Sequence, residues 1–81
     1  MTTIIGVKIS NRLDDAIKFQ KIITEFGCAI HTRIGLHKSD NRFCANSGII
    51  ILEVVDDSIT TNLERELLKI ENIEVQHMIF N

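Results

Sequence analysis

The chain has no proline, tryptophan or tyrosine among its 81 residues, and its aromatic side chains are four phenylalanines. Without proline, no helix or strand is interrupted from within. With so few aromatic rings, the chain lacks the stacking platform that binds single-stranded nucleic acid. Nine Lys and Arg against eleven Asp and Glu give a net charge of −2, so a basic surface for a phosphate backbone is missing as well. Direct nucleic-acid binding is therefore not expected.

Long apolar runs and cysteines are also scarce. No run approaches the about 20 apolar residues of a membrane-spanning helix, and the residues after Met1 do not show the pattern of a signal peptide. Cys28 begins a predicted strand and Cys44 lies beyond the far end of that strand. The strand separates them by about 30 Å, whereas a disulfide needs Cα atoms within about 7 Å. We expect reduced thiols in a cytoplasmic protein without membrane association.

Two periodicities divide the chain into six elements. Alternating or continuous apolar residues predict strands over residues 2–10, 28–37, 48–55 and 73–80. Apolar residues at helical spacing predict a first helix, with Asn11 as its N-cap and Gly27 at the C′ position. A second helix is expected to begin near Asp56 and to end near Asn72. The helical stripes consist of Leu13, Ala16, Ile17, Phe19, Ile22, Ile23 and Phe26 in the first helix and Ile59, Leu63, Leu67 and Ile70 in the second.

This order of elements predicts one α+β domain over residues 1–81 with the ferredoxin-like βαββαβ fold. The expected sheet is antiparallel, has the strand order 4-1-3-2 and carries both helices on one face. Unbroken alternation places Ile30, Ile34 and Leu36 under the helices, together with Ile50, Leu52 and Val54. The opposite face then carries Gly6, Lys8, His31, Arg33, Gly35, Ile49, Ile51 and Glu53. Its isoleucines and glycines favour self-association, and an ordinary solvated face is the alternative.

Three segments carry a resemblance to a known family. They are Ile9-Ser-Asn-Arg12, Thr32-Arg33-Ile-Gly-Leu-His37 with the downstream Cys44, and Gly48-Ile-Ile-Ile-Leu-Glu53. Over essentially the whole chain, the sequence resembles the small single-domain regulators of the iron-only hydrogenase system. That family is similar in fold to ACT domains and to the sensor domain of nickel-responsive repressors. The resemblance implies a non-catalytic, oligomeric regulator.

A small-ligand site is predicted where the first strand meets the first helix. Asn11 and Arg12 lie at the positive end of that helix, which attracts anions. Arg33 can hold a carboxylate or phosphate with its planar guanidinium. Thr32, Gly35 and His37 belong to the same motif and complete the candidate set. The alternative is structural: Asn11 caps the helix, and Arg33 pairs with Glu53 on the neighbouring strand.

A metal site is the second chemical hypothesis, with His37 and Cys44 as its ligands. Imidazole and thiolate suit zinc, nickel or iron. His31 lies about 20 Å from His37 along an extended strand, so a partner subunit or water would complete the coordination. In the alternative interpretation, His37 caps the strand end and Cys44 packs as a small apolar side chain. His77, on the last strand, is expected to be solvated at the sheet edge.

The combined prediction is a cytoplasmic, non-catalytic regulatory or sensor domain of the iron-only hydrogenase system. It acts as a homo-oligomer, a dimer or tetramer, and binds a small ligand or a partner protein through the loop of residues 37–48. A metal-responsive protein that uses His37 and Cys44 is the alternative, and a purely structural association module is the third. Catalysis is not expected, because the sequence has no phosphate-binding loop, activated nucleophile or paired-carboxylate pocket. The sequence does not identify a cofactor.

Overall fold

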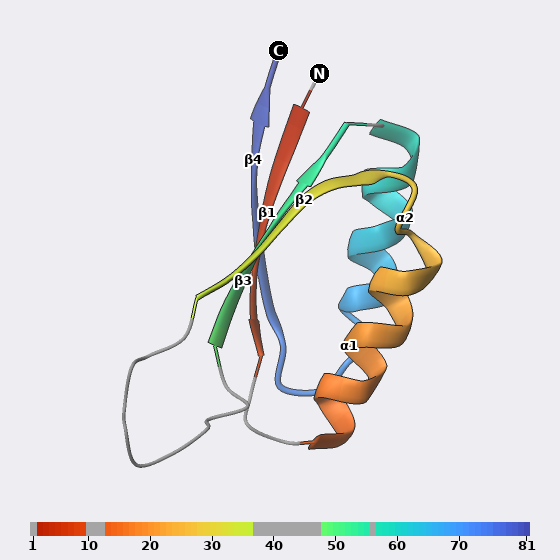
Figure 1. Ribbon diagram of the computed structural model, residues 1–81, viewed down its shortest axis with the longest axis vertical. Coiled ribbons are helices and arrows are strands. Elements are labelled where there is room, and N and C mark those ends of the chain that lie inside the picture. The colour runs from red at the N-terminus through yellow and green to blue at the C-terminus, as the bar shows by residue number, and fades with distance from the viewer. Residues whose placement is uncertain (1, 10–12, 37–47, 56) are drawn as a thin grey trace.

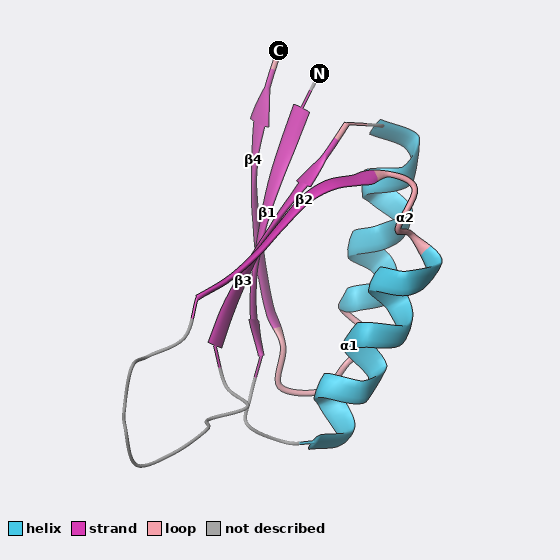
Figure 2. Cartoon of the chain, viewed as in Figure 1, coloured by secondary structure: helices cyan, strands magenta, loops and turns pink. Residues whose placement is uncertain are grey.

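The computed structural model describes residues 2–9, 13–36, 48–55 and 57–81, and these residues form the predicted βαββαβ fold (Figure 1). The elements are β1 (Thr2–Ile9), α1 (Leu13–Glu25), β2 (Ile30–Leu36), β3 (Gly48–Val54), α2 (Asp57–Leu67) and β4 (Glu74–Phe80). All neighbouring strands are antiparallel in the order β2-β3-β1-β4, which confirms the predicted order. Figure 2 shows both helices on the same side of the sheet.

The core lies between the helices and the inner face of the sheet, which is the face that they cover. Ile5 and Val7 of β1 and Leu52 of β3 are fully buried there, against Leu63 and Leu67 of α2. These positions confirm the alternation predicted for the first strand and the stripe predicted for the second helix. In α1, Phe19 and Ile23 are buried, whereas Ile17 is 58% exposed. The stripe predicted for the first helix was therefore too broad at that position.

The helix ends differ in detail from the sequence prediction. Gly27 follows α1 at the expected place, but no glycine among the described residues has a positive φ. The chain leaves α1 through short turns, in which the Gly27 and Ala29 amides donate to the carbonyls of Thr24 and Phe26. After α2, which ends at Leu67, further turns bring the chain to Asn72, whose φ of 59° is left-handed. Asparagine tolerates that conformation well.

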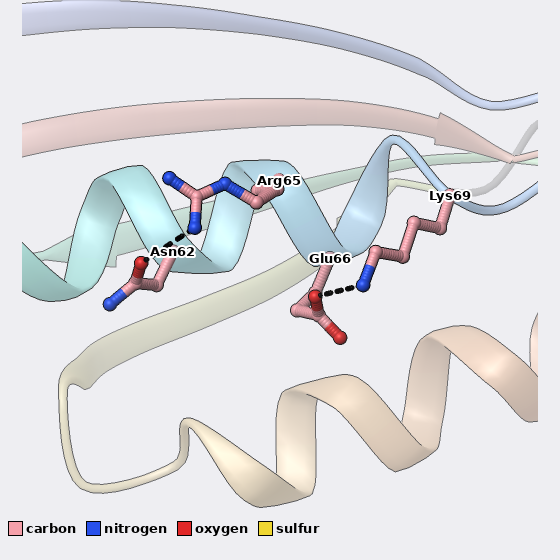
Figure 3. A network of polar contacts seen from close by, with 4 residues as sticks. All are labelled: Asn62, Arg65, Glu66 and Lys69. Carbon is pink, nitrogen blue, oxygen red and sulfur yellow. Dashed lines mark hydrogen bonds and ion pairs between the residues drawn. The ribbon is translucent and has the colours of Figure 1, made fainter.

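Two exposed polar contacts lie on α2 and on the turn that follows it (Figure 3). Lys69 Nζ lies 2.7 Å from Glu66 Oε2, and Arg65 Nη1 donates to Asn62 Oδ1 at 3.4 Å. Both pairs are three residues apart, a spacing that brings side chains together on a helix. Exposed pairs of this kind contribute about 0.2–0.5 kcal/mol each, so they support the helix surface without positioning a site. None of the described helices is long and apolar enough to span a membrane.

A β-bulge in β2 reverses the predicted faces of that strand. Ile30 pairs with Val54 and Thr32 pairs with Glu53, so two steps along β2 match one step along β3. The extra residue, His31, shifts the alternation by one position. Arg33 consequently pairs with the buried Leu52 on the inner face, and Ile34 pairs with Ile51 on the uncovered face. The prediction that placed Ile34 under the helices and both Arg33 and Gly35 on the opposite face was wrong for this reason.

The predicted start of that strand also needs correction. Residues 26–29 form turns, so Cys28 lies before β2 and is an exposed, free thiol. These turns carry the chain from the end of α1 back to the sheet, so β2 begins at Ile30 and not at Cys28. Cys44, the second cysteine, and Asn11, the predicted N-cap, lie outside the described residues.

Candidate functional site

Strand alternation places the described members of the predicted ligand site on both faces of the sheet. On the inner side of the sheet, Arg33 Nη1 donates a hydrogen bond to Gln20 Oε1 of α1 at 3.1 Å. The guanidinium carbon lies 5.8 Å from the centre of the Phe19 ring, within the range of a cation–π contact. The charged group of Arg33 is therefore engaged with α1.

Thr32 lies on the other side of the sheet. Its Oγ1 donates to Glu53 Oε1 at 2.8 Å, so Thr32, and not Arg33, is the cross-strand partner of Glu53. Gly35 shares the inner side with Arg33, and a Cβ there would meet no atom within 4 Å. Thr32 and Arg33 consequently do not converge on one ligand.

The other predicted site residues lie outside the described part of the chain. These residues are Asn11, Arg12, His37 and Cys44, so both the helix-start site and the metal site stay predictions. Within residues 2–9, 13–36, 48–55 and 57–81, no group of three or more His, Cys, Asp or Glu side chains could hold a metal ion.

The outer face of the sheet, opposite the helices, is the apolar surface that the described residues leave uncovered. Ile34 of β2 and Ile49 of β3 are 49% and 44% exposed, and Met78 and Phe80 of β4 are 58% and 54% exposed. The register places these side chains on one face, because Ile4 pairs with Met78 and Thr2 pairs with Phe80. Sequence reasoning missed the contribution of β4. The alternation of Glu74, Gln76, Met78 and Phe80 was the available signal.

A hollow of about 230 Å³ lies in this outer face above β1. It forms because Gly6 has no side chain, and its rim consists of Lys8, Ile49, Glu74 and Gln76. Lys8 and Glu74 are direct cross-strand partners, and Gly6 pairs with Gln76. A Cβ on Gly6 would meet only the Gln76 carbonyl, at 3.9 Å, so packing within the chain does not require a glycine here. The hollow therefore offers an apolar floor between one positive and one negative side chain.

His77 was predicted to be solvated at the sheet edge. It lies instead on the inner side of β4 and contacts α2. Its Nδ1 lies 2.7 Å from Oε1 of Glu64, an ion pair when the imidazole is protonated. That oxygen is buried and receives no well-directed hydrogen bond within the described structure. The contact joins β4 to α2 and lies on the face opposite the hollow.

Comparison with known proteins shows the fold. No family model and no curated protein matches the chain. The solved structure of the uncharacterized protein TM1266 from Thermotoga maritima is similar with a TM-score of 0.84 and 18% identity, covering 99% of this chain and 96% of that one. A formyltetrahydrofolate deformylase from Pseudomonas putida KT2440 has a TM-score of 0.59 and 10% identity over 29% of its length. SnoaB, a cofactor-independent oxygenase from Streptomyces nogalater, has a TM-score of 0.50 and 10% identity over 92% of its length. At these identities the likeness is one of fold, which different functions share.

Proposed function

We propose that this chain is a non-catalytic, cytoplasmic regulatory domain that works as a homo-oligomer through the outer face of its sheet. The regulated process is the iron-only hydrogenase system. The segments around Arg12, Thr32–His37 and Ile49 resemble the small single-domain regulators of that system. An exposed, free thiol at Cys28 is in keeping with a reducing compartment. Similarity to TM1266 over nearly the full length of both chains supports the small ferredoxin-like fold, not the regulated process.

The observation that carries the proposal is the apolar outer face. Ile34, Ile49, Met78 and Phe80 expose between 44% and 58% of their surface on one side of the sheet. The largest apolar patch of a monomeric protein is often functional, and patches rimmed by polar residues mark interaction surfaces. A domain of this size also buries only about 60–65% of its unfolded surface, so covering this face would add stability that the core alone does not supply.

The size of the face predicts a modest affinity. Four strands of about seven residues form a sheet of about 20 Å by 23 Å, or roughly 450 Å². Each partner of a standard interface buries about 800 Å², so the flat face alone lies at the weak end of the range. We therefore expect self-association with a dissociation constant in the micromolar range. The affinity would be higher if protruding side chains or the strand edges added contact area.

Sedimentation of two matched variants tests the surface. Met78→Glu places a charge in the outer face, where burial would leave it unpaired, and should convert the oligomer to a monomer. Leu68→Glu introduces the same charge at a residue that is 62% exposed outside the sheet, and should sediment like the wild-type chain. A wild-type chain that stays monomeric at several hundred micromolar, or equal behaviour of the two variants, would contradict the proposal.

The regulatory role is tested in the host cell. Deleting the gene should change iron-only hydrogenase activity or the abundance of its transcripts. Met78→Glu should reproduce the effect of the deletion, and Leu68→Glu should behave as wild type. Unchanged hydrogenase levels in the deletion strain would refute the regulatory role, whatever the oligomeric state of the purified chain.

A further inference from the structure

The outer-face residues of β1 and β4 form a self-complementary pattern. Along β1 they run from apolar through small to positive, as Ile4, Gly6 and Lys8. Their cross-strand partners on β4 run from apolar through amide to negative, as Met78, Gln76 and Glu74. A face that carries both halves of such a pattern can meet a copy of itself in a two-fold arrangement.

Within the described residues, no ion pair neutralises the charged end of the pattern. Lys8 and Glu74 are exposed and directly opposed, yet among the described residues no ion pair joins them. Glu74 Oε2 accepts one long bond, at 3.4 Å from Gln76 Nε2. The hollow above Gly6 lies between these side chains. Both charged side chains are exposed on the outer face, where a second molecule can reach them.

Building on the proposed self-association, we infer that two copies pack outer face to outer face around a two-fold axis that runs nearly along the strands, between β1 and β4. This axis places β1 of one copy over β4 of the other, so the contact covers these two strands and leaves Ile34 of β2 and Ile49 of β3 outside it. Lys8 then meets Glu74 of the partner subunit, and the symmetry repeats that ion pair once. The partner is a second copy of this chain, identified by the order of charges on its own sheet.

The same axis accounts for the hollow and for the exposed methionine. Because Gly6 and Gln76 are cross-strand partners, the axis between them places Gln76 of the partner subunit over Gly6, where the hollow receives it. Ile4 likewise packs under Met78 of the partner subunit. Face-packed sheets are separated by about 10 Å, a gap that a lysine and a glutamate bridge together. An axis between β1 and β3 would instead place Lys8 over Ile49 of the partner subunit and leave both charges without a counterpart.

Mixing two charge-reversal variants tests this geometry. Lys8→Glu and Glu74→Lys each oppose like charges across the axis twice, and each should weaken the homodimer about tenfold or more. In an equimolar mixture, a chain with two negative residues meets a chain with two positive residues, so the heterodimer should recover wild-type affinity. Charge repulsion within each chain is unchanged by mixing, which separates contacts between copies from contacts within one copy. Sedimentation velocity at low salt gives the affinities, and native mass spectrometry identifies the heterodimer.

Each outcome decides a separate question. Recovery in the mixture, weakened by 1 M salt, supports the axis between β1 and β4. Single variants that dimerise like wild type, or a mixture that stays monomeric, overturn this axis while Met78→Glu still reports on the outer face. A monomeric wild-type chain instead refutes the proposed self-association itself. If a reversed chain fails to fold by circular dichroism, Lys8→Gln and Glu74→Gln replace the reversals, and unchanged affinity in both overturns the inference.

Discussion

Arg33 shows how a single side chain can be assigned a role by its neighbours instead of by its type. Its guanidinium lies across α1, hydrogen-bonded to Gln20 and 5.8 Å from the centre of the Phe19 ring. An arginine on a strand is a natural candidate for anion binding. Here its side chain instead packs over Phe19 at the edge of the core. The stem and planar head of the side chain cover a buried aromatic ring that β2, an edge strand, would otherwise leave less protected.

Replacing Arg33 should therefore lower stability. Arg33→Gln removes the cation from the Phe19 ring and breaks the bond to Gln20, at a cost of about 1 kcal/mol in the free energy of unfolding. Arg65→Gln is the matched control, because Arg65 is exposed and makes a 3.4 Å contact within α2, so its loss should cost at most a few tenths of a kcal/mol. Urea denaturation measures both. Equal stability of the two variants would show that Arg33 does not support the core.

At the scale of the element, the bulge at His31 decides which residues of β2 reach the core. Before the bulge, Ile30 faces inward opposite Val54, and after it Arg33 faces inward opposite Leu52. Ile34 is turned outward with 49% of its surface exposed. One extra residue in one strand thus moves an isoleucine from the core to the outer face and an arginine in the opposite direction.

Paired Ile→Thr substitutions test the bulge, since threonine keeps the branched shape that strands favour. Ile34→Thr should cost less than about 1 kcal/mol, because its side chain is half exposed. Ile5→Thr introduces a hydroxyl at a fully buried position of β1 and should cost about 2 kcal/mol or more. Thermal denaturation at low micromolar concentration separates the two. A cost at Ile34 as large as that at Ile5 would mean that β2 runs without a bulge.

The joint between β4 and α2 is a second feature at this scale. Glu64 Oε1 is buried and faces His77 Nδ1 at 2.7 Å, which ties the edge strand to the helix above it. Removing the histidine leaves a buried carboxylate oxygen without its facing partner, whereas removing the glutamate leaves a histidine that is 46% exposed to water. The two losses should therefore be unequal.

A double-mutant cycle measures that asymmetry. His77→Phe should destabilise the protein by about 1–3 kcal/mol, and Glu64→Met should cost clearly less, since methionine fits a helix and requires no partner. The double variant should have the stability of Glu64→Met alone, because the buried Glu64 oxygen that would lack a partner is then absent. Additive losses in the double variant would show that the two side chains act independently.

For the whole molecule, the layer architecture leaves one face of the sheet uncovered by the described helices. Two helices cover one face of a four-stranded sheet, and the other face retains exposed isoleucine, methionine and phenylalanine side chains. At 81 residues the chain has no further element with which to cover them within the part that the structure describes. TM1266 has the same fold over nearly its full length, so this small arrangement is found in another protein. The uncovered face of this layer architecture is the basis of the proposed association.

The sequence by itself determined the kinds of element, their order and most of the core, because alternation and helical spacing are local properties of the chain. Ile5, Val7, Leu63 and Leu67 are buried as their periodicity predicted. Only the tertiary structure decided the faces of Arg33 and Ile34, since a bulge is defined by the partner strand and leaves no local mark at His31. The same holds for the contact of His77 with Glu64 and for the hollow above Gly6: each exists because residues distant in sequence are brought together by strand register and helix packing.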